Sequence, residues 1–578
     1  MSSAPTIDRR TAAHVLEQIA GLLELKGENQ FRVRAFRSAA RAVAGLQMSL
    51  QDALSSGTLA GTRGVGPATL QIVSELATTG RVRWLEELRA EIPPGLVEML
   101  RVPGFGIAKI RQVHELLGID SLIELEAAAR DGRLARLTRF GPKTAENILR
   151  GISFLRQSSG QRLHHHALAE AETLRAALSR IADVAGVTVA GDVRRRMEVV
   201  REIVLVVVTE LPPAEIFRRI SEHPGVDEFA GQDERRMTVH FAGGTGAQVV
   251  VTTPVNAGAV LVQATGSDAH LRALAARAGE LGLSLHGAAL WRGSAFVPTP
   301  DEAVVYETLG LAWVPPELRE GHGEVELAAR DALPTLVERS DLRGFLHCHT
   351  KYSDGTNTVE EIATACREAG YGYVGITDHS AAAAYAGGLA VDALRRQADE
   401  IDALNERIDG IRVLKGIEAD ILQDGSVDYD EAVLAGLDFV IGSVHSRFGM
   451  GRAAMTSRIL AAMDSPFLTI LGHPTGRLLL SRDPYDVDID AIIEKAAATG
   501  VALEINADPH RLDLDWRAAA RAHAAGVTTS IGSDAHGLAG IGNMDYGVAM
   551  ARKAGIGPDA LINARPVEEF LAFARARR

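Results

Sequence analysis

The segment Leu346–Gly355, which reads LHCHTKYSDG, places two histidines and an aspartate directly after a short apolar run. Similar apolar runs that end in a polar residue follow it, namely YVGITDHS, FVIGSVHS, LTILGHP and TTSIGSDAH, and each is typical of a short β-strand. Helical patterns separate these runs over Val359–Ala369, Val391–Ile408 and Ile489–Thr499. Strands that alternate with helices predict a parallel, barrel-like sheet whose active face lies at the C-terminal ends of the strands. The polar residues of all these runs then lie on that face.

Nine residues of this part of the chain are candidate metal ligands and candidate catalytic residues. One histidine after an apolar run is normally a core or surface residue, but a whole series at strand ends predicts a metal site. Imidazoles and carboxylates suit Zn, Mn or Fe, and so many ligands predict two or three divalent ions that polarise a phosphoryl oxygen and activate water. Cys348 should point away from the histidines beside it, because side chains alternate along a strand. The nine residues are His347, His349, Asp354, His379, Glu418, His445, His473, Asp534 and His536.

The order of these motifs, H-x-H, SDG, TDH, E, VH, GHP and SDAH, resembles the PHP (polymerase and histidinol phosphatase) domain over residues 341–578. All the ligand positions of that family are present. The resemblance implies a distorted seven-stranded α/β barrel, a trinuclear metal site and hydrolysis of phosphoesters.

The composition fits a large protein with several domains, since 46% of the 578 residues are apolar. An apolar run of about 18 residues is absent, which predicts no membrane span, and the N-terminal MSSAPTIDRR lacks the apolar core of a secretion signal. The two cysteines, Cys348 and Cys366, argue against a disulfide framework. We therefore expect a reducing, cytoplasmic location.

Charge is distributed unevenly along the chain. Residues 1–160 carry 21 Lys and Arg against 16 Asp and Glu, a net charge of +5. Residues 161–340 carry 17 against 24, and residues 341–578 carry 23 against 34, so the total is −13. A basic front end on an acidic body predicts binding of a polyanion through the N-terminal region.

Three glycine-centred turns in this basic region, GVGP, PGFG and FGPK, each stand before a helical pattern. Such a turn at the start of a helix aims backbone N–H groups at a phosphate. The turns resemble helix-hairpin-helix motifs, which grip a nucleic-acid backbone without reading its sequence, and the run FRVRAFR adds positive charge. The alternative is an ordinary solvated helical surface. The expected DNA-binding residues are Gly64, Gly66, Gly104, Gly106, Gly141, Lys143, Arg32 and Arg34.

The blocks NQFRVRAFRSAAR, AGDVRRR, TGSDAH and PPELREGHGEVELA, followed by the PHP-like part, resemble a bacterial family X DNA polymerase over nearly the whole chain. The resemblance implies a multidomain α/β protein with helical helix-hairpin-helix domains, a nucleotidyltransferase-type α+β palm and thumb, and a C-terminal distorted (βα)7 PHP barrel. The expected domains are an eight-kilodalton-type DNA-binding domain at 1–90, fingers at 91–160, a palm at 161–260, a thumb at 261–315, a linker at 316–340 and the PHP domain at 341–578.

The palm departs from the family at the triphosphate site. A family X palm has Gly-Ser followed by two basic residues, whereas this chain reads GDVRR over Gly191–Arg195. Asp192 stands where the serine would touch the triphosphate and repels it, although Arg194 and Arg195 keep the basic pair. After TGS, where the family has a lysine, this chain has Asp268.

The palm also departs at the three aspartates that hold two Mg²⁺ ions in the family. Their positions are occupied by Glu202, Val204 and Gln248, so one carboxylate remains and it is one methylene longer. One carboxylate cannot hold two ions in tight octahedral geometry, so we expect little Mg²⁺ binding in this palm. An alignment shifted by a few residues would instead bring in Glu198, Asp227 or Glu228.

Other residues receive plainer interpretations. The 5′-phosphate lyase chemistry of the family needs a lysine, but Ala68–Thr79 contains none and Ile72 stands at the nucleophile position. His164–His166 fan outward from a helix or loop, so we expect no ligand role. A contact with phosphate at the rim of the metal site is an open alternative for Glu504, Asn506, His510 and Arg511.

Together these patterns predict a DNA-repair or DNA-processing protein whose PHP part acts as a metal-dependent 3′–5′ exonuclease and whose polymerase half is an inactive scaffold. The expected partner is DNA that is gapped, nicked or 3′-ended. We expect no association with a membrane. Two alternatives stay open, an active gap-filling polymerase with a PHP exonuclease and a PHP phosphatase that acts on a small phosphate ester. The sequence leaves the metal, the preferred lesion, the oligomeric state and any protein partners undetermined.

Overall fold

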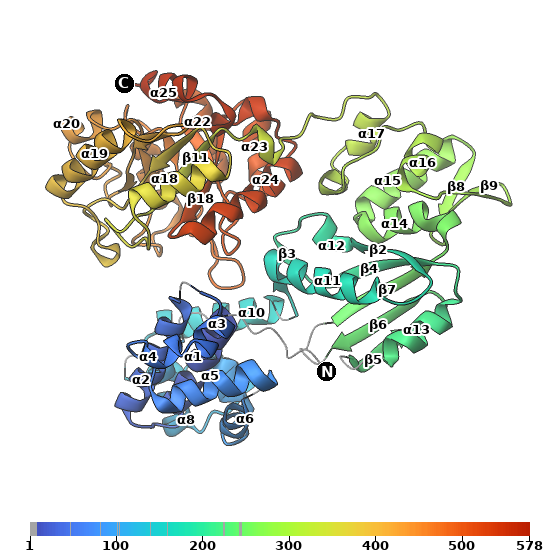
Figure 1. The fold of residues 1–578 in the computed structure, drawn as a ribbon, viewed down its shortest axis with the longest axis horizontal. Helices are drawn as coiled ribbons and strands as arrows, with labels where there is room; N and C mark the ends of the chain where they lie inside the picture. Colours follow the sequence, from blue (N-terminus) through green and yellow to red (C-terminus); the bar gives the residue numbers. More distant parts are fainter. Residues whose placement is uncertain are drawn as a thin grey trace. The chain divides into compact units, whose positions relative to one another are not determined.

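The computed structural model describes residues 9–46, 48–80, 82–100, 102, 105–138, 140–158, 160–222, 226–241 and 246–578. The chain forms two compact units, Met1–Ser159 and Gly160–Arg578 (Figure 1).

Unit 1 is built from α-helices around one apolar core. In the first helix Leu16, Ile19 and Leu23 are at most 1% exposed, at the three- and four-residue spacing that lines one face of a helix. The helices are α1 (Arg9–Leu25), α2 (Gln30–Ala44), α3 (Leu50–Ser55), α4 (Thr58–Gly61), α5 (Pro67–Thr79), α6 (Arg83–Ala90), α7 (Pro94–Met99), α8 (Ile107–Leu117), α9 (Leu122–Arg130) and α10 (Pro142–Ser158).

Unit 2 begins with a five-stranded mixed sheet in the order β2-β4-β7-β6-β5. The central strand β4 has the sequence IVLVVVT and is buried on both faces, as expected for an unbroken apolar run. Helices α11 and α13 pack on one face and α14 on the other. The elements are α11 (His164–Leu178), β2 (Val184–Ala190), α12 (Gly191–Arg194), β4 (Ile203–Thr209), α13 (Pro213–Ser221), β5 (Val226–Gln232), β6 (Arg236–Phe241), β7 (Gly246–Thr252) and α14 (Ala257–Thr265).

A smaller α+β region follows, with its own apolar core and a three-stranded sheet in the order β10-β9-β8. Its largest buried side chain is Arg319, which forms an ion pair with Glu302. A buried charge of this kind requires such a partner. The elements are α15 (Asp268–Glu280), β8 (Leu283–His286), β9 (Ala289–Arg292), β10 (Ala295–Val297), α16 (Glu302–Thr308) and α17 (Glu324–Ala328).

The C-terminal part is a parallel sheet in the order β13-β12-β11-β18-β17-β16-β15-β14. Its two edge strands, β13 and β14, are consecutive in the chain and separated only by Gly416 and Ile417, so the sheet curls back on itself. A bridge between His379 and Glu418 links β12 to β14 at this point. The strands are β11 (Gly344–Cys348), β12 (Tyr373–Ile376), β13 (Arg412–Lys415), β14 (Glu418–Asp420), β15 (Ile441–Ser443), β16 (Ile470–Leu471), β17 (Ala502–Asn506) and β18 (Thr529–Ala535).

Helices cover the outside of this curled sheet (Figure 1). The expected multidomain α/β fold class is confirmed. Of the helices expected from periodicity, the first two end earlier, at Glu368 and Asn405, and the third spans the expected residues. The helices are α18 (Val359–Glu368), α19 (Val391–Asn405), α20 (Glu431–Ala435), α21 (Arg452–Ala462), α22 (Ile489–Thr499), α23 (Trp516–Ala524), α24 (Met544–Lys553) and α25 (Val567–Arg575).

The inside of the sheet is apolar at the N-terminal ends of its strands. Phe570 of α25 stacks there against Tyr373 and Phe439, with ring centroids 5.5 and 5.3 Å apart. Gly375 leaves room for this plug, because a Cβ at that position would lie 2.4 Å from the ring of Phe439. The polar residues are therefore confined to the opposite, C-terminal ends of the strands.

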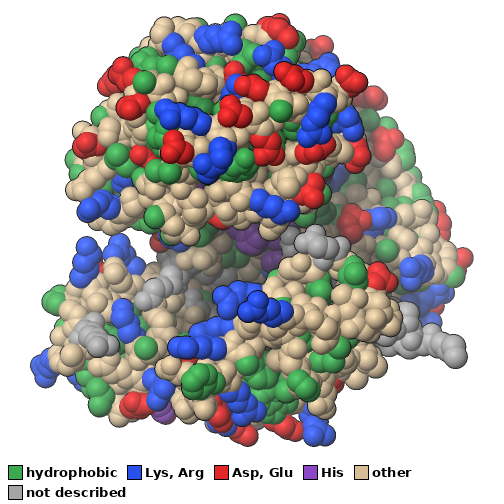
Figure 2. Space-filling view, turned by 60° about the vertical axis from the view of Figure 1, so that its left-hand side comes forward, with side chains coloured by type: hydrophobic (Ala, Val, Ile, Leu, Met, Phe, Trp, Pro, Cys, Tyr) green, Lys and Arg blue, Asp and Glu red, His purple; other side chains and the backbone are tan. Residues whose placement is uncertain are grey.

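The surface agrees with a chain that is exposed to water. On the face shown in Figure 2, charged side chains of both signs are interspersed with scattered hydrophobic side chains. Among the residues that the structure describes, no helix combines the length and apolar character needed to cross a membrane.

Candidate metal centre

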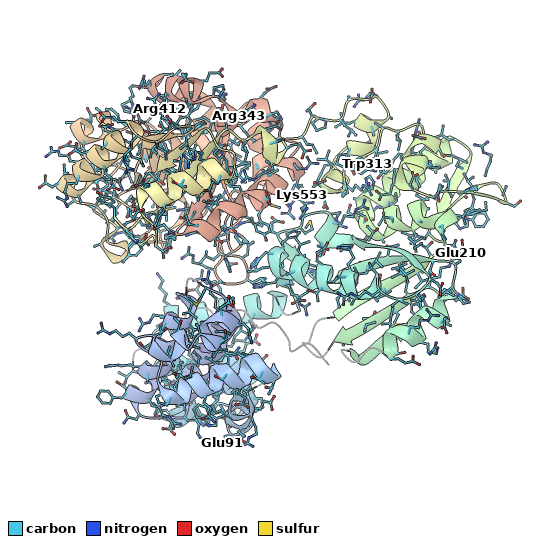
Figure 3. All side chains as sticks on the ribbon, in the orientation of Figure 1. Glu91, Glu210, Trp313, Arg343, Arg412 and Lys553 are labelled. Atoms are coloured by element: carbon cyan, nitrogen blue, oxygen red, sulfur yellow. The ribbon has the colours of Figure 1, made fainter. Side chains whose placement is uncertain are left out.

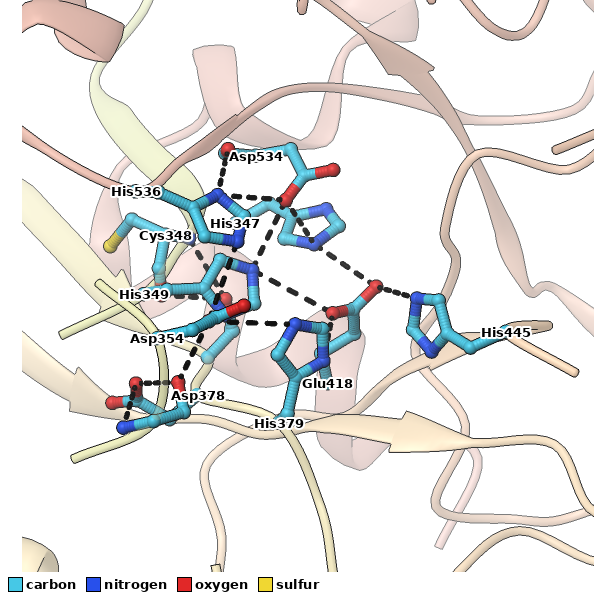
Figure 4. A network of polar contacts seen from close by, with 12 residues as sticks. His347, Cys348, His349, Asp354, Asp378, His379, Glu418, His445, Asp534 and His536 are labelled. Atoms are coloured by element: carbon cyan, nitrogen blue, oxygen red, sulfur yellow. Dashed lines mark hydrogen bonds and ion pairs between the residues drawn. The ribbon is translucent and has the colours of Figure 1, made fainter. Parts of the chain in front are cut away.

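The nine candidate ligands lie together at one edge of the parallel sheet. Figure 4 labels all of them except His473. Eight of them come from the last residues of a strand or from the loop that follows it, because consecutive parallel strands all end at the same edge of a sheet, and Glu418 is the first residue of β14, shortly after the end of β13. Two come from β11 and its end, two from β18 and its end, and the others from the ends or starts of β12, β14, β15 and β16 and from the loop after β11. The structure thus brings together residues that are up to 189 positions apart, His347 and His536.

Glu418 is at the centre of the group and is fully buried. Its Oε1 lies 3.0 Å from Nε2 of His473, 3.2 Å from Nε2 of His347 and 3.3 Å from Nε2 of His445. Its Oε2 lies 2.9 Å from Nδ1 of His379. With Nε2 of His349 3.6 Å from Oε2, this one carboxylate faces five imidazoles, so it could be shared by more than one ion.

Two aspartates complete the other side of the centre. Oδ1 of Asp534 lies 3.1 Å from Nε2 of His349 and 3.7 Å from Nδ1 of His536. Oδ1 of Asp354 lies 3.4 Å from Nε2 of His536 and 3.7 Å from Nε2 of His379. The nine residues form four overlapping groups whose ligand atoms lie within 4.8 Å of one another. Overlapping groups of this kind suit a cluster of ions that share ligands.

The donor atoms fit a divalent ion in direction as well as in type. Nε2 of His347, Nδ1 of His379 and Oε2 of Glu418 are buried and have no hydrogen-bond partner in the described part of the chain, although they lie close together. Buried polar atoms are normally paired, so atoms that converge without hydrogen bonding are suited to a shared cation. Imidazole nitrogen and carboxylate oxygen together suit Zn, Mn or Fe.

The electrostatics of the pocket favour positive charge. Burial alone would lower the pKa of His445, but Glu418 and Asp420 outweigh it and raise that pKa to about 10. Burial also opposes the shift at His347, whose pKa Glu504 and Glu418 hold well above its ordinary value. In turn, His445 and His347 overcome the effect of burial and keep the pKa of Glu418 well below its ordinary range. Divalent ions would supply the same compensating charge.

Three of the nine residues have a left-handed backbone, with φ of 64° at His347, 25° at His473 and 51° at Asp534. Residues other than glycine rarely adopt this conformation, and where they do the surrounding structure enforces it. At His347 the pairing of β11 with β18 shifts register between Leu346 and Cys348. The strand ends are thus distorted where they present ligands.

Cys348 points away from the centre, as the alternation along the strand predicts. Its Sγ donates to the carbonyl oxygen of Gly375 at 3.3 Å, and the residue belongs to the apolar core. Burial raises the pKa of this thiol well above its ordinary value. A thiolate ligand is therefore not available at this position.

Two supporting carboxylates were not singled out as such from the sequence. Asp420 accepts a hydrogen bond from Nδ1 of His445 at 2.7 Å, and Glu504 accepts one from Nδ1 of His347 at 2.5 Å. Each bond turns Nε2 of its histidine towards Glu418, as carboxylates behind metal-binding histidines do. Glycine provides the room, since a Cβ at Gly532 would lie 2.2 Å from Oε1 of Glu504. The only sequence signal for Asp420 is that it stands two residues after the candidate ligand Glu418 in GIEAD.

A positive charge stands at the edge of the centre. Nε of Arg511 lies 3.5 Å from Oδ2 of Asp534, while its neighbour Asp508 accepts a hydrogen bond from the backbone N–H of the exposed His510. Burial opposes the shift, but Asp534 and Asp513 raise the pKa of Arg511 further, so the guanidinium stays charged. Of the four residues considered for this rim, Asn506 instead donates to Glu504 at 3.1 Å.

The five-stranded sheet places the three degenerate palm positions near one another. Val204 on β4 pairs with Ala190 on one side and with Gln248 on β7 on the other. Val204 is buried at 9% exposure, and a Cβ on Gly191 would lie 3.0 Å from its Cγ2. Val204 therefore packs as an apolar side chain against the backbone at Gly191.

The basic pair of the palm is held by acidic residues of this chain. Both Nη atoms of Arg194 lie 2.7 Å from the two carboxylate oxygens of Glu302. Arg195 pairs with Glu320 at 3.0 Å and with Asp192. Their positive charge is therefore neutralised inside the fold.

The remaining palm carboxylates are poorly placed to replace the missing aspartates. Burial, then Asp192, raises the pKa of Glu202. Glu198 is buried and lies 3.5 Å from Arg477 and 3.3 Å from Arg517, both in the C-terminal part of unit 2. The side chains of Asp227 and Glu228, like Gly104 of the second glycine turn, lie outside the described residues.

The glycine turns of unit 1 stand at helix starts. Gly66 precedes α5, Gly106 precedes α8, and Gly141 directly precedes Pro142 at the start of α10. A Cβ at any of these three glycines would meet nothing within 4 Å, so their backbones are open to a ligand on that side. Gly64 has φ of 99°, which permits the tight turn.

Unit 1 also carries the three basic residues that the sequence singles out. Arg32 and Arg34 on α2 are exposed, as is Lys143 on α10. Ile72 is buried in the core of unit 1 at 6% exposure, so it lies where a lysine nucleophile could not reach solvent.

The three successive histidines lie on α11 beside the C-terminal part of unit 2. His164 is buried near Tyr546, with ring centroids 6.2 Å apart, and burial followed by Arg196 lowers its pKa to about 4. His165 packs 5.1 Å from the ring of His510. His164 and His165 therefore pack at this contact, whereas His166 is exposed.

Models of known families match four parts of the chain. A helix-hairpin-helix domain matches residues 8–82, a SAM-like helix-hairpin-helix tandem matches 96–153, the DNA polymerase beta thumb matches 260–320 and the PHP domain matches 346–508.

Relatives match the whole chain or its C-terminal part. The chain is 35% identical over 570 residues to the DNA polymerase/3′-5′ exonuclease PolX of Bacillus subtilis, covering 98% of this chain and 99% of that protein. It is 29% identical over 243 residues to a probable phosphatase of Syntrophotalea carbinolica, covering 39% of this chain and 94% of that protein. A probable phosphatase of Thermoanaerobacter pseudethanolicus is 28% identical over 234 residues, with 38% of this chain and 88% of that protein covered. The shorter relatives therefore match one part only, whereas the full-length match and the helix-hairpin-helix, thumb and PHP regions show that the chain belongs to the family X DNA polymerases with a C-terminal PHP domain.

Proposed function

We propose that this protein binds DNA through unit 1 and hydrolyses DNA phosphodiesters as a 3′–5′ exonuclease at the centre around Glu418. The observation that carries the proposal is the convergence of nine ligand-type side chains in four overlapping groups at one edge of a parallel sheet. Because this phosphoesterase site belongs to a member of a DNA polymerase family, DNA is the substrate that we propose for it.

The nine residues are the proposed ligands of two or three divalent ions, of which Mn²⁺ or Zn²⁺ fits the mixed nitrogen and oxygen donors best. Such ions supply Lewis-acid stabilisation of the phosphoryl oxygens and lower the pKa of water. Asp420 and Glu504 hold His445 and His347 in the orientation that presents Nε2. Arg511 places a fixed positive charge at the rim, where it attracts a phosphodiester.

DNA, rather than a small phosphate ester, is supported by unit 1. Three of its helix starts carry open glycines, next to exposed basic residues on α2 and α10. Backbone N–H groups at such turns contact phosphates without reading bases, so the proposed substrate is a DNA end, gap or nick of any sequence. Hydrolysis of a small phosphate ester would not require a DNA-binding unit.

The palm is proposed to be a scaffold without polymerase activity. Val204 and Gln248 stand where two metal-binding carboxylates are required, and Arg194 and Arg195 are already paired with Glu302 and Glu320. The alternative is a polymerase site with weak activity, which would have to use Glu202 as a metal ligand.

We also propose the division into domains at 1–90, 91–160, 161–260, 261–315, 316–340 and 341–578. A cytoplasmic location is proposed from the two cysteines, Cys348 and Cys366, which are buried free thiols.

The test is the His347→Ala, His349→Ala double variant in an exonuclease assay on 3′-recessed, nicked and gapped DNA. We expect it to lose the nuclease activity and part of its metal while it keeps DNA affinity, because the glycine turns are in unit 1. His523→Ala, an exposed histidine on α23, serves as the matched control and should keep full activity. Degradation of DNA by the double variant at the wild-type rate would show that the site is elsewhere.

A further inference from the structure

An exposed aromatic side chain stands beside the metal centre. Tyr385 lies in the loop between β12 and α19 and is 72% exposed. Its ring centroid lies 6.2 Å from the ring of His379 and 6.3 Å from that of His445. The exposed ring is therefore accessible to a ligand that is bound at the metal centre.

The loop that carries Tyr385 is fixed at its base. The backbone N–H of Leu389 donates to the carbonyl of His379 at 2.9 Å, and the N–H of Ala382 donates to Asp428 at 2.8 Å. Gly388 closes the loop so tightly that a Cβ there would lie 1.9 Å from the carbonyl oxygen of Ser380. Tyr385 is therefore presented by a well-anchored loop that begins at a metal-ligand position, and little ordering is needed before it can bind.

We propose that Tyr385 is a stacking platform for the 3′-terminal nucleobase of the DNA strand whose scissile phosphate is held at the metal centre. This inference rests on the proposed exonuclease function and adds the group that the site recognises. A base is joined to its phosphate through a single sugar, a reach comparable with the separation of the Tyr385 ring from the rings of His379 and His445. Every base has an aromatic face, so such a platform binds any sequence. It also distinguishes a nucleotide from a small phosphate ester, which has no base to stack.

The test compares two oligonucleotides that differ only at the 3′ end, one with a terminal thymidine and one with a terminal abasic tetrahydrofuran residue. The measurement is the ratio of kcat/KM for the two substrates, in metal-loaded protein of known metal content. Wild-type protein and Tyr385→Phe should prefer the thymidine end by about tenfold, as expected for one base–aromatic stack. Tyr385→Ala and Tyr385→Leu should bring the ratio close to one, because leucine keeps bulk but has no aromatic face.

A ratio in Tyr385→Ala equal to that of wild type, or a wild-type ratio of one, would overturn the stacking role. If alanine lowers the metal content, the comparison of leucine with phenylalanine at equal metal content decides the question. Failure of the proposed exonuclease function has a different signature, in which the metal-loaded wild-type protein degrades neither oligonucleotide.

Discussion

Replacing Asp420 tests whether the side chains behind the ligands set metal affinity. Asp420 accepts a hydrogen bond from Nδ1 of His445 at 2.7 Å, and its side chain is 6% exposed. Losing a partner of this kind typically costs about 10–100-fold in metal affinity or activity. We expect about 100-fold for Asp420→Ala, which also frees the ring of His445 to rotate, and about tenfold for Asp420→Asn, whose amide oxygen still accepts.

The assay is exonuclease activity titrated with Mn²⁺ after chelation, together with metal analysis of the gel-filtered protein. Activity of both variants should recover at higher metal concentrations, because the ligands themselves are intact. Asp424→Asn is the matched control, since this exposed aspartate, four residues along the chain, bonds only to Ser426 in its own turn. Metal dependence of Asp420→Ala that coincides with that of the control would refute the reasoning.

Four further outcomes are expected. Metal-replete protein should carry two or three transition-metal ions per chain and lose phosphoesterase activity on strong chelation, and elemental analysis that finds less than one ion would exclude the cluster. Because the folded pKa of His445 is about 10, above its ordinary value, the stability that this histidine contributes to chelated protein should be fully present below about pH 6.5 and should be lost as pH rises towards 10. The melting temperature should therefore fall over that range, and a flat profile between pH 6.5 and 10 would contradict this linkage. DNA affinity should weaken with rising salt, as phosphate contacts require, and a salt-independent Kd would speak against unit 1 as the binding unit. In a variant whose PHP centre is inactive, primer extension should be absent or very slow with Mg²⁺ or Mn²⁺, because losing even one charge-stabilising group typically costs about 10²–10³ in rate. Restoring aspartate with E202D, V204D and Q248D should improve Mg²⁺ binding in the palm. Strong extension that disappears in E202A would overturn the degenerate-palm interpretation.

The strand-end motifs carried most of the predictable information. In a parallel sheet with helical crossovers, any polar residue that follows an apolar strand is delivered to the same edge, whatever its distance along the chain. Candidates such as His347 and Asp534 could therefore be grouped from the sequence, and the structure places them together. The helix at Ile489–Thr499 was equally clear because its apolar spacing is regular and Gly500 ends it in the left-handed conformation.

The supporting contacts could not be read in the same way, because they depend on the register between strands. Glu504 reaches His347 only because β17 and β11 flank β18, where Gly532 leaves space for its carboxylate. Nor does the sequence reveal that His164 would be buried against Tyr546, since that contact joins two distant parts of unit 2. Pairing partners of this kind need the tertiary fold.

The basic pair of the palm is held by ion pairs inside the fold. Glu302 is 6% exposed and is gripped by Arg194 and by the fully buried Arg319, and although burial opposes the shift these two arginines lower its pKa to about 2. Turning Arg194 towards a triphosphate would break its two hydrogen bonds to Glu302, although Arg319 would still pair with that carboxylate.

Arg195 is tied in a similar way to the C-terminal part of unit 2. Lys553 on α24 donates to the carbonyl oxygen of Arg195 at 3.0 Å and pairs with Glu320, which also holds the guanidinium of Arg195 (Figure 3). The GDVRR segment thus joins the palm to the thumb and to the part of the chain that carries the metal centre. That structural role gives both arginines a function inside the fold that does not depend on the proposed loss of the palm's metal-binding carboxylates.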